Sequence, residues 1–138
     1  MSQTRIYLPL DADALRRLAA QREIGTTVLD AFAVTARVER SLPEGDREDW
    51  EYAALAEAVD AAGALRAGMV ARRVVAAADV DSESVRDGGD GMAGVRVSGP
   101  VPLSRVVAFH IDETAGDEGM ADLLWYDATE LAEVVRLL

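Results

Sequence analysis

The sequence predicts an α+β protein in which about three main helices form one layer against a mixed sheet of roughly five or six strands. Half of its 138 residues are apolar, which is enough for a buried core, but only 5% are aromatic. Short runs rich in Val and Ala alternate with segments whose apolar residues recur at helical spacing. The strand-like segments outnumber the helices that could connect parallel strands, which disfavours a doubly wound sheet. The length predicts a single domain over residues 1–138.

The first part of the chain reads as a strand, a helix and a second strand. Residues 5–8 are expected to form a strand that Pro9 ends, because proline cannot donate a ladder hydrogen bond. Asp11 is placed to cap a helix at its start, and Gly25 is placed to end it. Residues 28–35 then supply the second strand.

Two helices follow, and the second is the longest that the sequence predicts. Thr35 can cap a short helix over residues 36–41. Asp46 can cap the long helix, whose first turn carries acidic residues that favour the positive helix end. Gly68 is expected to mark its end. The inner face is predicted from apolar residues at helical spacing, namely Tyr52, Leu55, Ala56, Val59 and Ala62.

The second half of the chain is richer in strands than in helices. Residues 71–78 lack the alternation of a half-exposed strand, which predicts a strand covered on both faces. A short helix is expected from about Ser82, and the glycine-rich stretch 87–94 is expected to be a loop. A capping pattern at residues 127–130 begins a terminal helix. The remaining strands are expected at three short apolar runs, residues 95–98, 105–111 and 123–126.

The absence of cysteine and lysine excludes several kinds of chemistry. Without cysteine there are no disulfides, thiolate metal ligands or cysteine nucleophiles, and one histidine is too few for a standard zinc site. All 14 cationic side chains are arginine, so no lysine can form a Schiff base or bind phosphate in a P-loop. We therefore predict no cofactor and no metal. The acidic stretches 87–90 and 112–122 leave a Mg²⁺ or Ca²⁺ site open, although solvated loops explain them more simply.

The charge balance argues against nucleic acid and membrane partners. Acidic residues outnumber basic ones by 25 to 14, and the net charge is −11, whereas nucleic acids and anionic membranes attract clustered cations. No run of residues resembles a membrane span or a secretory leader. We therefore expect a soluble cytoplasmic protein. The use of arginine alone as the cation is typical of a GC-rich genome.

The only histidine, His110, is the residue on which most catalytic hypotheses depend. It lies in a predicted strand, and Asp112 follows two residues later on the same strand face. A carboxylate beside an imidazole fixes its tautomer and raises its pKa, so the two residues could form a catalytic general base and its orienting acid. A half-buried strand histidine that bonds to the backbone or to a neighbouring acid is the simpler interpretation.

Three arginines are candidate ligand-binding residues because they lie on or beside predicted strands. These are Arg5, Arg96 and Arg105. Their planar guanidinium groups could together form an anion pocket. The favoured alternative is that each pairs with an acidic residue on an adjacent strand.

Several short motifs along the chain carry a resemblance to a known family. They lie at residues 5–9, 31–35, 51–55, 73–80, 96–98, 100–103 and 123–126. With these motifs the chain resembles a family of short, uncharacterised actinobacterial proteins. The motifs are mostly strand cores and turns, and the family has no assigned activity, so the resemblance implies no catalytic residues. Residues 79–103 are also loosely similar to the later half of ADP-ribosyltransferase-like folds, whose catalytic residues are not recognisable here.

These observations favour a small non-catalytic protein that binds a partner protein or associates with itself as a homodimer. The alternative is an enzyme that acts on a nucleotide or phosphoester through an arginine pocket with His110. The environment of His110 distinguishes the two hypotheses, because the enzyme needs this side chain in a concave pocket with two or more arginines.

Overall fold

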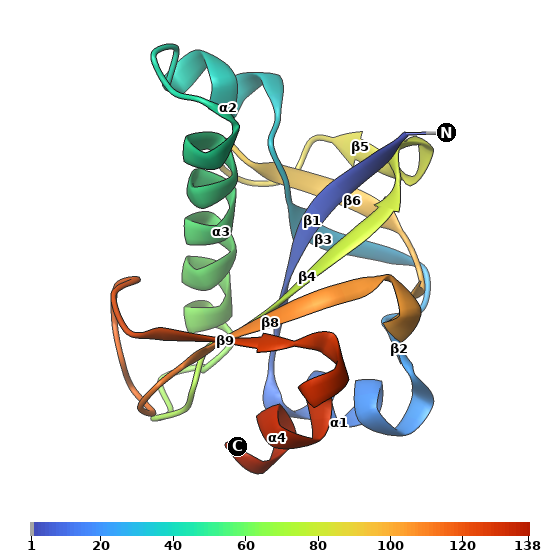
Figure 1. Ribbon diagram of the computed structural model, residues 1–138, viewed down its shortest axis with the longest axis vertical. Helices are drawn as coiled ribbons and strands as arrows, with labels where there is room; N and C mark the ends of the chain where they lie inside the picture. Colours follow the sequence, from blue (N-terminus) through green and yellow to red (C-terminus); the bar gives the residue numbers. More distant parts are fainter. Residues whose placement is uncertain (1) are drawn as a thin grey trace.

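The computed structural model describes residues 2–138, which form a seven-stranded sheet, a two-stranded sheet and four α-helices (Figure 1). The strands of the large sheet lie in the order β5-β6-β3-β1-β4-β8-β9, and β2 pairs with β7. The strands are β1 (Gln3–Leu10), β2 (Glu23–Ile24), β3 (Val28–Phe32), β4 (Val74–Asp81), β5 (Val85–Asp87), β6 (Gly94–Ser98), β7 (Val101–Pro102), β8 (Val106–Asp112) and β9 (Leu123–Asp127). The helices are α1 (Ala12–Gln21), α2 (Ala36–Ser41), α3 (Arg47–Ala64) and α4 (Leu131–Arg136).

The predicted α+β class is confirmed, and the details of the sheet differ in two ways. The large sheet has seven strands where five or six were expected. Its neighbouring strands pair antiparallel, so it is not a mixed sheet. The additional strand is β5, three residues long, which pairs with β6 directly after a 3₁₀ turn at Ser82–Ser84.

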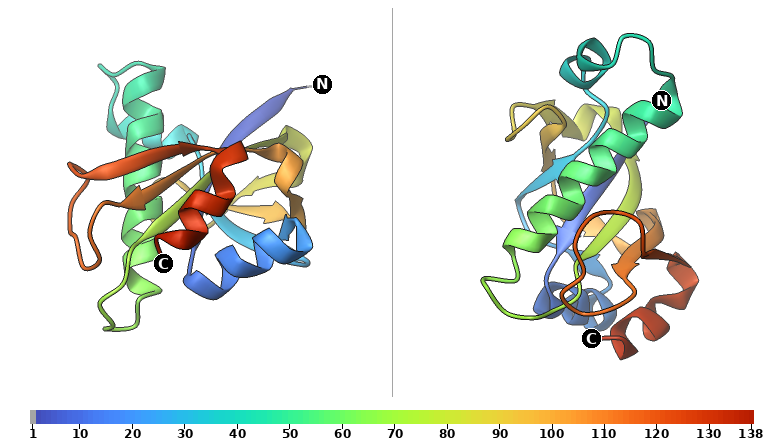
Figure 2. Two further views of the ribbon diagram at one scale, coloured as in Figure 1. Left: turned by 60° about the horizontal axis from the view of Figure 1, so that its bottom comes forward. Right: turned by 90° about the vertical axis from the view of Figure 1, so that its left-hand side faces the viewer.

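Helices cover both faces of the large sheet, whereas the sequence predicted one layer. The long helix α3 lies on one face and contacts α2, while α1 and α4 lie side by side on the other face (Figures 1 and 2). The β2–β7 pair packs on the same face as α1 and α4. The cause lies in the central strands, because β1 and β4 carry apolar side chains on both faces and each face must be covered.

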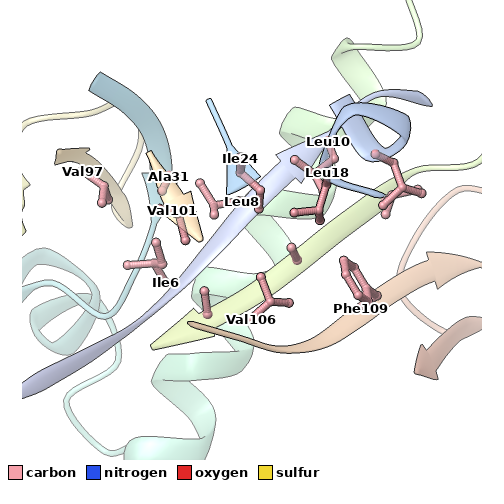
Figure 3. Packing of buried hydrophobic residues seen from close by; sticks show 14 of the residues in the cluster. Ile6, Leu8, Leu10, Leu18, Ile24, Ala31, Val97, Val101, Val106 and Phe109 are labelled. Atoms are coloured by element: carbon pink, nitrogen blue, oxygen red, sulfur yellow. The ribbon is translucent and has the colours of Figure 1, made fainter. Parts of the chain in front are cut away.

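The larger hydrophobic core lies between the sheet and the layer of α1 and α4 (Figure 3). In β1, Ile6 and Leu8 point into this core, whereas Tyr7 points to the face under α3. In β4, Ala76 belongs to the larger core and Val75 to the core under α3. The prediction that this strand is covered on both faces is therefore confirmed.

Helix α3 packs on the sheet with a face of small residues, and the predicted inner face is wrong in part. Its buried residues are Ala54, Ala58, Val59 and Ala62. Tyr52, which was expected to face inward, is 58% exposed, and Leu55 is half-buried. Alanines allow the helix to approach the sheet closely, so steric fit and not side-chain hydrophobicity decided its rotation.

The capping pattern at the start of α3 is confirmed. The side chain of Asp46 accepts a hydrogen bond from the backbone N–H of Asp49, and the Asp49 side chain accepts one from the backbone N–H of Asp46. The helix ends at Ala64, before Gly68. Asp11 caps α1 as predicted by accepting from the backbone N–H of Ala14.

Strand β1 continues through Pro9, so the predicted end of this strand is wrong. Pro9 lies opposite Val75 of β4, and Leu10 is the last strand residue. On its other side, β1 pairs with β3 at Tyr7, opposite Phe32. Tyr7 and Phe32 are the one pair that β1 and β3 form within residues 2–138, so a proline two positions later removes no hydrogen bond to β3.

Helix α1 ends at Gln21, and its C-terminal cap is Arg22 and not Gly25. Arg22 adopts the left-handed conformation with φ 63°, and its N–H donates to the carbonyl of Leu18. The chain then enters β2 at once. The position of β2 against β7 therefore decides where this helix stops.

Candidate functional site

A shallow groove of about 310 Å³ lies between the first half of α3 and the strands β1, β4, β8 and β9. We call it the α3 groove. Its floor is low because Ala77 of β4 and Ala108 of β8 lie directly opposite each other and have small side chains. The lining residues are Arg5, Tyr7, Glu48, Glu51, Tyr52, Leu55, Ala77, Ala108, His110 and Trp125.

Strand register brings the sheet residues of the groove together. Trp125 of β9 lies opposite His110 of β8, and Arg5 of β1 lies opposite Asp79 of β4. Side chains at alternate strand positions share a face, so these four residues lie on the face that α3 covers in part. The groove is the part of this face that the helix leaves open.

Arg5 forms an ion pair inside the sheet face and is not a free cation. The Nε of Arg5 donates to Asp79 Oδ1 at 2.6 Å, and the Nη2 of Arg5 donates to Asp79 Oδ2 at 3.1 Å. This hydrogen bonding raises the pKa of Arg5, and the nearby carboxylate of Glu51 raises it further. Arg5 therefore stays charged, with its charge balanced by Asp79.

The helix side of the groove is acidic and aromatic. Among residues 2–138, no cation lies within ion-pair distance of Glu48 or Glu51. Tyr52 on α3 is 58% exposed and Trp125 on β9 is 61% exposed. Burial raises the pKa of Tyr7 on the floor, and the negative field of Glu51 adds to this increase. The α3 groove therefore contains two carboxylates without an ion-pair partner among the described residues, beside two exposed aromatic rings.

His110 is half-buried at the sheet side of the groove and is held in its neutral form. Burial lowers the pKa of its imidazole, and the positive charge of Arg5 lowers it further. No side-chain hydrogen bond to His110 is formed within residues 2–138, and its ring nitrogens are not among the buried polar atoms. A neutral imidazole with accessible nitrogens can accept a hydrogen bond from a ligand.

Asp112 is engaged elsewhere and does not orient His110. Its carboxylate accepts hydrogen bonds from the backbone N–H of Arg73 at 2.6 Å and from the guanidinium of Arg73 at 2.7–3.1 Å. Arg73 also donates to the carbonyl of Gly119, which anchors the loop between β8 and β9. The Arg73 ion pair takes the place of the expected contact between His110 and Asp112. A catalytic role of either residue stays a prediction.

The three candidate ligand-binding arginines are not gathered into one pocket. Arg5 lines the α3 groove, whereas Arg96 lies on β6 and Arg105 precedes β8. Arg96 lies opposite Asp30 of β3, with 3.6 Å between the charged atoms, and the Arg105 guanidinium is 3.5 Å from Asp81. Each of the three thus lies beside a carboxylate of a neighbouring strand, as in the pairing alternative.

The sequence did not identify the helix side of the groove. Glu48 and Glu51 are explained equally well as first-turn acids of a helix, and Tyr52 was assigned to the inner face of α3. Trp125 reads as a core or interface anchor, because an aromatic residue in a short strand carries no sign of exposure. The only available indication was the alanine content of α3, which permits a close helix–sheet contact that turns the larger side chains outward.

Within residues 2–138, no group of three or more His, Cys, Asp or Glu side chains is arranged to hold a metal ion. None of the helices in this part of the chain has both the length and the apolar character needed to cross a bilayer.

No curated protein and no solved structure matches this chain. A family model matches residues 4–121, a stretch that begins at the second residue of β1, continues through β8 and ends before β9. The chain belongs to this family, DUF6912, which is described as a family of unknown function.

Proposed function

We propose that this protein is a non-catalytic protein-binding domain whose α3 groove takes a cationic side chain from a basic segment of a partner protein. The observation that carries the proposal is the combination of two exposed rings, Tyr52 and Trp125, with the unpaired carboxylates of Glu48 and Glu51. Aromatic faces attract a guanidinium or ammonium group through their quadrupole, and carboxylates balance its charge.

The remaining groups of the groove support the same ligand chemistry. The neutral imidazole of His110 can accept a hydrogen bond from the cation, and it adds no positive charge to repel it. Arg5 is already balanced by Asp79 and adds no net charge either. A volume of about 310 Å³ fits one long side chain, and the open shape suits a segment that continues along the surface.

The charge of the whole chain supports a basic partner. At a net charge of −11 the protein attracts cationic segments over distances longer than direct contact. Such attraction raises the rate of association and weakens as salt increases. A partner of this kind therefore binds more weakly at high ionic strength.

The residues of the α3 groove support the alternative hypothesis, an enzyme that acts on a phosphoester, less well. A phosphate in the α3 groove would face Glu48 and Glu51, and the only arginine in the lining is already paired with Asp79. The enzyme hypothesis needed two or more arginines beside His110. We propose the binding domain for this reason.

The proposal retains two expectations from the sequence. We infer a cytoplasmic location from the composition, which has no cysteine. We also infer an actinobacterial source, which the arginine-only cation content and the resemblance described above both favour.

The test is a titration of the ¹⁵N-labelled protein with an eight-residue peptide of alternating Gly and Arg, followed by NMR. The indole N–H resonance of Trp125 should shift, whereas that of Trp50, which donates to the carbonyl of Leu42, should stay in place. Trp125→Ala should weaken binding about two- to fivefold. Replacing both Glu48 and Glu51 by Gln should weaken it comparably.

A matched control separates local recognition from overall charge. The double variant Glu113→Gln/Glu133→Gln removes the same two negative charges from exposed positions outside the groove and should bind the peptide normally. Equal binding of an alternating Gly and Glu peptide, or equal losses in the two double variants, would overturn the proposal.

A further inference from the structure

We propose that the protein forms a homodimer through an apolar surface at the C-terminal end of α3, with a second copy of this chain as the occupant. We call this surface the α3-end patch. It consists of Leu65, Met69, Val70 and Leu138 around a pocket of about 440 Å³. This inference is independent of the α3 groove and goes beyond the proposed function.

The pocket of the patch is built by segments that are distant in the sequence. The end of β1, the start of α1, the end of α3, the segment before β4 and the end of the chain all contribute to it. Its apolar lining residues are Leu10, Ala12, Ala62, Leu65, Met69, Val70, Ala71, Ala115, Leu137 and Leu138. It is larger than the α3 groove and more apolar in composition.

Exposed apolar side chains gather at this pocket. Leu65 is 47% exposed, Met69 73%, Val70 80% and Leu138 37%, and these are four of the nine large apolar side chains exposed within residues 2–138. Scattered exposed apolar residues are normal, whereas a cluster beside a hollow is typical of an interaction surface. A protruding Met69 next to a pocket is also self-complementary, because in a two-fold contact each copy can insert this side chain into the other.

The charges around the patch argue for a second copy as the partner. Two molecules that each carry a net charge of −11 repel each other, so they can meet only at a face where charge is balanced. The pocket lining contains three arginines, Arg16, Arg66 and Arg72, and two acids, Asp11 and Asp13. The α3 groove, in contrast, is acidic.

Two of these rim residues carry opposite charges and have no ion-pair partner within residues 2–138. Arg72 is half-buried, and no carboxylate among residues 2–138 lies within ion-pair distance of it. Within the described chain, Arg72 donates only to the backbone carbonyls of Leu137 and Glu113. Asp11 on the same rim likewise has no cation within ion-pair distance in the described chain. A two-fold contact brings each unpaired group of one copy toward the opposite charge of the other.

The position of the patch leaves both α3 grooves open in the dimer. Tyr52 of the groove and Leu65 of the patch are 13 positions apart on one helix, which corresponds to about 20 Å along its axis. A dimer joined at the patch presents two grooves at its far ends. Two linked sites bind a partner with repeated basic segments more tightly than one site does.

The test is sedimentation velocity over protein concentrations of about 1 to 100 μM, a range that covers common homodimer affinities. The wild-type chain of 14.7 kDa should sediment at twice that mass at the upper concentrations. Raising the salt concentration should strengthen the dimer, because the screened repulsion between two copies of net charge −11 outweighs the few rim ion pairs that salt also weakens, and apolar contact stays intact. Binding of a basic peptide to the α3 groove should show the opposite salt dependence.

Variants identify the surface. Met69→Asp and Val70→Asp place a charge in the exposed patch and should weaken the dimer by about tenfold or more. Met92→Asp makes the same change at another exposed methionine, 49% exposed and outside the patch, and should leave the dimer unchanged. Circular dichroism confirms folding, and the milder Met69→Ala variant repeats the measurement.

Two results overturn the proposal. The first is a mass of 14.7 kDa at every concentration, and the second is a dimer that Met69→Asp and Val70→Asp leave intact. In the first case, a melting temperature that rises with octanoate would assign the pocket to a small amphiphilic ligand. Failure of this proposal leaves the peptide titration of the α3 groove unaffected.

Discussion

Arg73 and Asp112 form a buried ion pair in which the carboxylate accepts hydrogen bonds from both the backbone N–H and the guanidinium of Arg73. Their side chains are 3% and 1% exposed. The hydrogen bond to Asp112 raises the pKa of Arg73, so the arginine stays charged. The pair joins the residue before β4 to the last residue of β8.

Removing one partner of this pair should destabilise the protein strongly. Asp112→Asn leaves the Arg73 guanidinium buried without its counter-charge, and we expect the free energy of unfolding to fall by about 3–5 kcal/mol. The double variant Arg73→Met/Asp112→Leu should recover most of this loss, because it removes both charges and fills a similar volume. Urea denaturation of the three proteins measures the difference.

A half-exposed ion pair provides the matched control. The side chains of Arg5 and Asp79 are 37% and 33% exposed, so Asp79→Asn should cost at most about 1 kcal/mol. Equal losses for Asp79→Asn and Asp112→Asn would show that burial of the Arg73 pair adds nothing to its effect.

His110 should make stability depend on pH just below neutrality. Its pKa is lowered below the usual 6.5 by burial and by Arg5, so the unfolded chain binds a proton more readily than the folded protein does. Stability from the neutral imidazole is therefore complete above about pH 6.5 and decreases as the pH falls toward the folded-state pKa. Thermal unfolding of wild-type protein and His110→Gln between pH 7.5 and about pH 5 measures this contribution.

The wild type and His110→Gln should differ in how their melting temperatures depend on pH. The melting temperature of the wild type should fall more steeply with decreasing pH than that of His110→Gln. An NMR titration of the His110 ring should give a midpoint below that of an unstructured histidine peptide. A midpoint above the peptide value would contradict the neutral imidazole on which hydrogen-bond acceptance in the α3 groove depends.

The rotation of α3 can be tested with one enlarged alanine. Ala58 is fully buried against the sheet, so Ala58→Leu should force an overpacked contact and cost about 1–3 kcal/mol. Ala56, which the sequence placed on the inner face, is only half-buried, and Ala56→Leu should change the unfolding free energy little. Urea denaturation measures both variants. If Ala56→Leu lowered the unfolding free energy more than Ala58→Leu does, α3 would pack on the sheet with the face that the sequence predicts.

Local chemistry along the chain was sufficient to predict much of the fold. Thr35, Asp46 and the capping pattern at residues 127–130 all begin helices as expected, because a cap forms with residues three positions away and needs no distant partner. The strand pattern of residues 71–78 correctly indicated cover on both faces. The predictions at Pro9 and Gly25 are wrong because pairing with distant strands overrides local preference there.

The candidate site was only partly predictable for a similar reason. His110 and Arg5 were identified as unusual residues in strands, and both line the α3 groove. Asp112 was assigned to His110 from their spacing, but Arg73, 39 positions away, occupies its carboxylate. Sequence spacing shows which side chains share a strand face, whereas the nearest hydrogen-bond donor depends on which segments meet in space.

By itself, the sequence determined the class of the fold, the starts of the helices and the kinds of chemistry that are excluded, because each depends on composition or on neighbours a few residues apart. The tertiary structure decided which face of α3 packs on the sheet, that Glu48 and Glu51 stand beside Trp125, and that Met69 and Val70 surround a pocket. Each of these arrangements brings together residues that are distant in the chain. They depend on the close packing of the α3 alanines against the sheet. The acidic groove and the apolar patch, at the two ends of one helix, follow from that packing.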